Sequence, residues 1–145
     1  MKLFGYRRTV NLLAATLVLT ATGCSWYVSP GANHGAVNAD NLVFPEQAGA
    51  WQKSGKIVDK NDIAKIKVGS SKDEIYQAIG TPHFKEGFNA REWDYMLKFY
   101  DANDNLETCQ FKIIFDNNYE GRLRGGEFYA TQLYWQPASC AKYAS

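Results

Sequence analysis

The chain has 145 residues, which is enough for one domain of ordinary size together with shorter flanking segments. Aromatic residues make up 14% of the chain, a content that favours a packed hydrophobic core over disorder. The formal net charge is only +1, so the sequence lacks the strong positive charge of a general nucleic-acid-binding protein. We therefore expect no nucleic-acid partner.

The amino-terminal residues 1–23 have the pattern of a secretory signal peptide. Lys2, Arg7 and Arg8 precede an apolar run from Val10 to Leu19, and small residues follow that run. The apolar run is shorter than the roughly 20 residues that a transmembrane helix needs. Removal of the signal peptide takes away three positive charges and no negative charge, which leaves a formal net charge of −2.

The signal peptide ends in the residues "ATGC", which resemble a lipobox, the site at which bacteria attach diacylglycerol to a cysteine and cleave before it. The usual lipobox has Leu three residues before the cysteine, whereas this chain has Ala21 there and Leu19 two residues earlier. We expect Cys24 to become the lipid-bearing mature amino terminus. The alternative is an ordinary secreted protein cut near Ala21 or Gly23. Ser25, rather than Asp, follows the cysteine, which points to the periplasmic face of the outer membrane.

Residues 24–58 are interpreted as a lipid-anchored tether, because Gly, Pro, Asn and Ser are frequent and no period is sustained. A purely flexible linker rarely contains many large apolar residues, yet this segment has several: Trp26, Tyr27, Leu42, Val43, Phe44 and Trp51. Two interpretations stay open. Some of these residues pack back onto the folded domain, or they form a docking peptide for a partner or for the membrane surface.

The folded domain is predicted for residues 59–145 and begins with one or two helical turns. Asn61 is a candidate helix cap, and Ile63 and Ile66 are expected to face inward. Gly69 then ends this first helix. Two short helices in succession would form a small hairpin.

The second helix is predicted from its end signals. Ser71 and Glu74 have the spacing of a capping box, in which a hydroxyl and a carboxylate satisfy unpaired backbone N–H groups. Gly80 suits a left-handed C-cap, and Pro82 prevents the helix from continuing. Because so short a helix is unstable alone, its apolar face must pack against another element.

Three segments follow in which apolar residues alternate, which predicts β-strands. They read "REWDYMLKFY", "LETCQFKIIFD" and "EFYATQLYWQ". The last segment places four residues on one face: Tyr129, Thr131, Leu133 and Trp135. Short connections predict an antiparallel three-stranded meander, with the helices on one face and solvent on part of the other. The predicted fold class is therefore α+β, and Asp94 is expected to be an exposed strand carboxylate.

Three cysteines are an odd number for an exported protein, but Cys24 is assigned to the lipid. Cys109 lies in the middle predicted strand, and Cys140 follows the third strand. In an oxidising compartment this pair is most simply a disulfide, with two free buried thiols as the alternative.

No metal ligands cluster at short spacing, and His34 and His83 are both expected to be solvated, so no metal or cofactor is expected. Phe84 and Phe88 lie in a loop without periodicity. They are either partner-contacting residues on an anchored loop or plugs between helix and sheet. Arg122 and Arg124 could meet acidic lipid or a partner, or they could belong to a plain solvated loop.

Several short motifs occur in the same order as in the SmpA/OmlA/BamE family of outer-membrane lipoproteins, which this sequence resembles over about residues 60–125. They are Gly69, Ser71, Ile79-Gly80-Thr81-Pro82, Trp93-Asp94-Tyr95 and Phe115-Asp116. The amino-terminal BamE-like domain of certain OmpA-family lipoproteins is similar over a longer stretch, but the peptidoglycan-binding OmpA domain of those proteins is not part of the 145 residues.

The resemblance implies two short helices packed on a three-stranded antiparallel sheet within residues 59–145. It also implies a non-catalytic accessory role in outer-membrane protein assembly, through contact with partner lipoproteins and with anionic phospholipid. No enzyme activity is expected. The alternative is a stand-alone envelope-stress or inhibitory lipoprotein that binds a soluble periplasmic protein, because the fold alone does not decide the partner.

Overall fold

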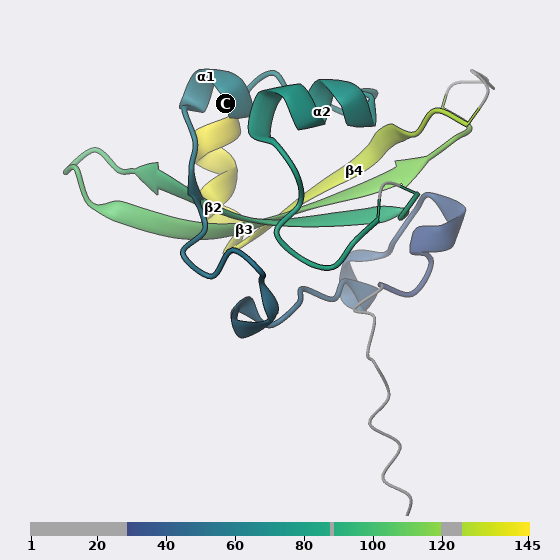
Figure 1. Cartoon of the computed structure of the whole chain (residues 1–145), viewed down its shortest axis with the longest axis horizontal. Helices are drawn as coiled ribbons and strands as arrows, with labels where there is room; N and C mark the ends of the chain where they lie inside the picture. Colours follow the sequence, from purple (N-terminus) through teal and green to yellow (C-terminus); the bar gives the residue numbers. More distant parts are fainter. Residues whose placement is uncertain (1–28, 88, 120–125) are drawn as a thin grey trace, which may run out of the picture.

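A four-stranded sheet lies at the centre of the computed structural model, which describes residues 29–87, 89–119 and 126–145. Two α-helices and a carboxy-terminal 3-10 helix cover one face, and an amino-terminal segment crosses the other (Figure 1). The elements are η1 (Ala32–His34), η2 (Ala39–Asn41), η3 (Gln47–Gly49), β1 (Lys56–Ile57), α1 (Lys60–Ile63), α2 (Lys72–Ile79), β2 (Glu92–Tyr100), β3 (Leu106–Asp116), β4 (Tyr129–Gln136) and η4 (Ala138–Ala144). Within the described ranges, no helix is both long enough and apolar enough to cross a membrane.

The sheet has the strand order β1-β2-β3-β4 and is mixed. The predicted antiparallel meander is present as β2, β3 and β4. The prediction of only three strands is wrong, because β1 pairs in parallel with β2 through Lys56–Leu97 and Ile57–Lys98. A strand of two residues is too short to show an alternating pattern, so its presence depends entirely on the neighbouring strand. The fold class is α+β, as predicted.

The predicted capping box of α2 is present in full. The Ser71 hydroxyl accepts the Glu74 backbone N–H at 3.2 Å, and the Glu74 carboxylate accepts the Ser71 backbone N–H at 2.8 Å. Gly80 has a φ of 84°, but its ψ of −162° places it outside the left-handed helical region predicted for it. The predicted cap of α1 is wrong by two residues: Asp59, not Asn61, is the cap, and its carboxylate accepts the Asn61 N–H at 2.7 Å.

The main core lies between the helices and the sheet. It contains the predicted inward residues Ile63 and Ile66 together with the aromatic face of β2 and β3. A bulge between Ile114 and Phe115 changes the predicted alternation of β4, because Ala130 pairs with Phe115 and joins this core. Thr131 instead points to the other face, where its hydroxyl donates to the Gly35 carbonyl at 2.6 Å.

The second face of the sheet is covered rather than partly solvated over much of its area. Residues 29–50, which we call the strap, cross this face and place Ala32 and Val37 against Ile114. Ala50 at the end of the strap packs with Phe84 and Met96. Of the two interpretations left open for the tether, packing onto the domain therefore describes the strap.

Candidate functional site

The strap covers a buried charge cluster on the second face of the sheet. The Lys112 ammonium, fully buried on β3, forms ion pairs with Glu92 and, at 2.6 Å, with Asp94. Ser29 donates two hydrogen bonds of 2.8 Å to Glu92, one from its backbone N–H and one from its hydroxyl. The prediction that Asp94 is an exposed carboxylate is wrong, because Asp94 is only 1% exposed. Strand alternation correctly assigned its face. The apolar residues of the tether pointed to packing onto the domain as one interpretation, but not to this face of the sheet.

His83 is also buried, which contradicts the expectation that both histidines are solvated; His34 is exposed. The Nδ1 atom of His83 accepts the backbone N–H of Met96 at 3.0 Å, so a neutral His83 carries its proton on Nε2. Burial lowers the pKa of His83. Its role in the described structure is to satisfy the free edge of β2 beyond the end of β1.

The disulfide between Cys109 and Cys140 is present, with a Cα–Cα distance of 6.1 Å. It joins η4 to β3 next to Glu107, whose carboxylate accepts the Tyr143 hydroxyl at 2.5 Å and pairs with Lys142 at 2.8 Å. Glu107 and the two sulfur atoms lie close enough together to resemble a metal-ligand group. Because both sulfur atoms are bonded to each other, neither is available as a thiolate ligand.

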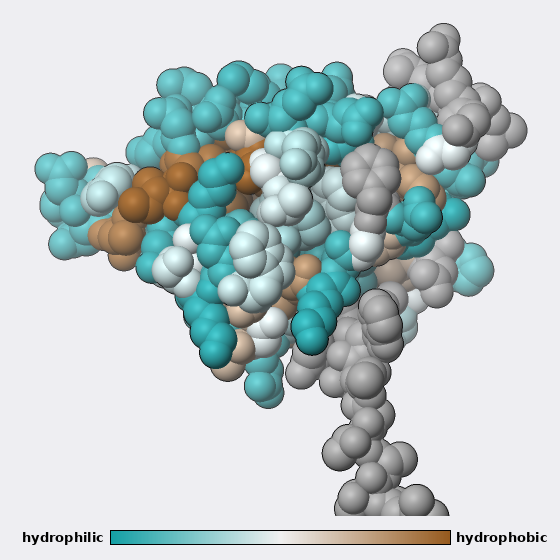
Figure 2. Space-filling view, viewed as in Figure 1, coloured by the Kyte–Doolittle hydropathy of each residue, from teal (hydrophilic) through white to brown (hydrophobic). Residues whose placement is uncertain are grey.

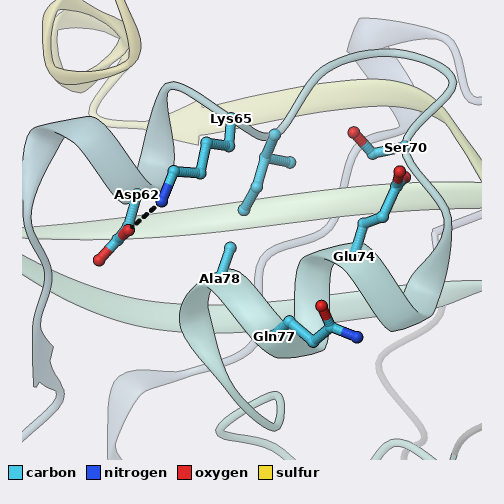
Figure 3. Close-up of a pocket in the computed structure, with 7 residues that line it drawn as sticks. Asp62, Lys65, Ser70, Glu74, Gln77 and Ala78 are labelled. Carbon is cyan, nitrogen blue, oxygen red and sulfur yellow. Dashed lines mark hydrogen bonds and ion pairs between the residues drawn. The ribbon is translucent and has the colours of Figure 1, made fainter.

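An open groove of about 450 Å³ runs between α1 and α2 (Figure 3). Its lining is mostly polar: Asp62, Lys65, Ile66, Ser70, Glu74, Gln77 and Ala78. The charged groups in it are already engaged, since Asp62 pairs with Lys65 at 2.7 Å and Glu74 belongs to the capping box. The residues that line the groove include no histidine or cysteine that could serve as a general base or a nucleophile.

Exposed apolar side chains gather beside β1 and at the end of the β2–β3 hairpin. Ile57, Tyr100 and Leu106 are 54%, 51% and 44% exposed. Tyr100 pairs with Leu106 across the hairpin, and Ile57 pairs with Lys98, two residues before Tyr100 on the same face. Figure 2 shows hydrophobic surface concentrated at this end of the molecule.

Trp51 extends this group along the same edge of the sheet. Its side chain is 58% exposed, while its indole N–H donates to the Pro82 carbonyl at 2.9 Å and its ring meets the His83 ring edge-on. We call Trp51, Ile57, Tyr100 and Leu106 the contact surface. Single exposed apolar residues are ordinary, but a group of them that includes two aromatic rings is typical of a protein-binding surface.

The site residues predicted from the sequence are not those of the contact surface. Cys24, Phe88, Arg122 and Arg124 lie outside the described residues. Phe84 is 7% exposed and packs with Ala50 and Met96, so its side chain fills a gap and is not offered to a partner. Sequence reasoning missed Ile57, Tyr100 and Leu106. Tyr100 and Leu106 stand at the ends of alternating patterns, whereas Ile57 lies in a strand too short to show one.

The geometry thus defines a small α+β module with a disulfide-tied core and an apolar contact surface at one edge of its sheet. Residues 55–123 match the family model described as the outer membrane protein assembly factor BamE domain. The match covers a little under half of the chain, and the sequence motifs resemble the same family.

Curated relatives carry the same name, outer membrane protein assembly factor BamE. The protein from Salmonella typhimurium is 21% identical over 111 residues, which cover 77% of this chain and 85% of the relative. The Escherichia coli protein is also 21% identical, over 77% of this chain and 84% of its own length. The Xanthomonas campestris protein is 27% identical over 75 residues, covering 51% of this chain and 57% of the relative.

Proposed function

We propose that this protein is a non-catalytic accessory factor in outer-membrane protein assembly that works by binding a partner protein. The observation that carries the proposal is the contact surface on a domain that matches the BamE family model. The relatives named as assembly factors support the process, and the exposed apolar side chains support action by contact. The expected partners are other outer-membrane assembly proteins, with anionic phospholipid as a second ligand.

The proposal includes the anchor. Residues 1–23 act as a signal peptide, and Cys24 then carries the lipid that holds the protein on the periplasmic face of the outer membrane. The chain from Cys24 to the strap would set the distance between the membrane and the folded domain. The signal peptide and the lipobox-like residues support this part of the proposal.

Co-purification from envelopes extracted with mild detergent tests the partner. Ile57→Asp places a charge in the centre of the contact surface, and Val68→Asp is the matched control, because Val68 is an equally exposed aliphatic residue between α1 and α2. We expect assembly proteins to be recovered with the wild-type protein and with Val68→Asp, and to be lost with Ile57→Asp.

Equal recovery of assembly proteins with all three proteins would show that the contact surface does not bind the partner. Recovery of a soluble periplasmic enzyme in place of assembly proteins would instead support the inhibitory lipoprotein. Thermal unfolding of each variant shows that a loss of partner is not a loss of fold, since substitutions at exposed positions usually change stability by only about 0.5 kcal/mol.

A further inference from the structure

The loop of residues 83–86 takes the place of a strand along the edge of β2. The His83 backbone N–H donates to the Asp94 carbonyl at 2.9 Å, and the Asp94 backbone N–H donates to the Glu86 carboxylate at 2.6 Å. The Met96 N–H donates to His83, as described above. The side chains of Glu86 and His83 thus provide the hydrogen-bond acceptors that the backbone of a neighbouring strand would otherwise supply. We call residues 83–86 the clasp.

The clasp brings two carboxyl groups into contact. The Glu86 carboxyl group, held by the Asp94 backbone N–H at 2.6 Å, lies beside the Asp94 side chain and interacts with it. Asp94 Oδ2 pairs with the Lys112 ammonium, while its Oδ1 is buried without a hydrogen-bond partner among the described residues. An ionised carboxylate only accepts hydrogen bonds, so Glu86 can supply the donor that the buried Asp94 Oδ1 lacks only when Glu86 carries a proton.

The surrounding charges indicate which group holds that proton. Burial raises the pKa of Asp94 to about 6, but Lys112 of β3 lies against Asp94 and favours its ionised form. The second neighbouring acid, Glu92 of β2, is held by Ser29 and by the same lysine. The strap contributes to this cluster only uncharged groups among its described residues, namely Ser29 and the Phe44 ring near Lys112.

The clasp itself adds His83, which its burial keeps neutral. Burial raises the pKa of Tyr95, and the neighbouring Glu86 adds to that rise. Lys72 of α2 and Lys112 are the cations that interact with Glu86. Burial, more than the charge of Asp94, raises the pKa of Glu86. Glu86 is therefore the neutral partner and Asp94 the ionised one.

We infer that the folded protein holds one proton between Glu86 and Asp94, and that this proton keeps the clasp closed on β2. Loss of the proton would place two negative charges side by side in a buried site, which favours the release of Glu86 to solvent. The clasp also supports Trp51, whose backbone N–H donates to the His83 carbonyl at 2.9 Å. Opening of the clasp at high pH would therefore also affect Trp51 of the contact surface, a consequence that rests on the proposed function. The shared proton itself does not depend on the proposed function.

The sign of the pH dependence follows from linkage. A carboxyl group whose pKa is raised by folding stabilises the protein fully below its unfolded pKa, and this contribution is lost as the pH rises towards the folded value. One extra bound proton in the folded state makes the unfolding constant rise about tenfold per pH unit. Lys72 and His83, whose pKa values are lowered, act in the opposite direction, so the wild-type profile alone does not isolate Glu86.

The variant Glu86→Gln isolates the contribution of Glu86 to the pH dependence of unfolding. Its amide can donate to Asp94 and accept from the Asp94 backbone N–H, but it has no titrating proton. Urea unfolding from pH 5 to pH 9 is measured for the wild type, for Glu86→Gln and for Glu46→Gln, an exposed control. We expect the unfolding constant of the wild type to rise about tenfold per pH unit relative to Glu86→Gln. Glu46→Gln should run parallel to the wild type, and a Glu86→Gln profile parallel to the wild type would overturn the inference.

A second measurement uses the wild-type protein alone and needs no variant. Carbon-13 NMR of the wild-type side-chain carboxyl groups should show Glu86 still protonated at pH 7. An ionised Glu86 at that pH, with a midpoint near the ordinary value of about 4.3, would contradict the shared proton. The amide signals of Asp94 and Met96 should change as Glu86 ionises; unchanged signals would refute the opening of the clasp. These measurements use no partner, so their outcome is independent of the assembly role.

Discussion

Replacement of Lys112 by methionine should strongly destabilise the domain. Methionine has a similar length but no charge, so Glu92 and Asp94 would remain buried without a cation; their side chains are only 4% and 1% exposed. Breaking a buried ion pair by removing one partner typically costs about 3–5 kcal/mol. For a domain of this size, each 1 kcal/mol lowers the melting temperature by about 4–8 °C, so we expect a fall of more than about 10 °C.

Urea unfolding followed by tryptophan fluorescence measures this change, with Lys98→Met as the matched control. Lys98 lies on the same face of the sheet, opposite Thr108 on β3, but is half-buried and outside the cluster. The control should lose less than about 1 kcal/mol. If Lys112→Met proves as stable as the wild type, the reasoning that removal of the buried cation destabilises the domain is refuted.

Removal of the disulfide by Cys109→Ser and Cys140→Ser together should cost about 3–4 kcal/mol, the value expected for a closed loop of this length. The two half-cystines are 31 residues apart, and mass spectrometry of non-reduced peptides should find them joined; two free thiols in protein taken from the envelope would exclude the bond. Cys24→Ser should leave the precursor uncleaved and unlabelled by radioactive fatty acid. Labelling equal to that of the wild type would rule out the proposed anchor.

Local sequence determined the parts of the fold whose stabilising groups are close together in the chain. The capping box of α2 joins residues three apart, and strand alternation depends on neighbouring side chains. The faces of β2 could therefore be assigned in advance, and the pairing of Cys109 with Cys140 followed from the number of cysteines once Cys24 was set aside. The family motifs lie in these same segments, which is why the resemblance was visible from the sequence.

Tertiary structure decided everything that depends on distant segments meeting. Ser29 and Glu92 are 63 residues apart, and Lys112 meets Asp94 only because β2 and β3 are paired in register. The sequence shows Asp94 as an ordinary charged residue on the outer face of a strand, since nothing local states that the strap will cover it. Burial, and the proton that Glu86 and Asp94 share, are properties of that packed arrangement, because desolvation arises only when the surrounding groups are in place.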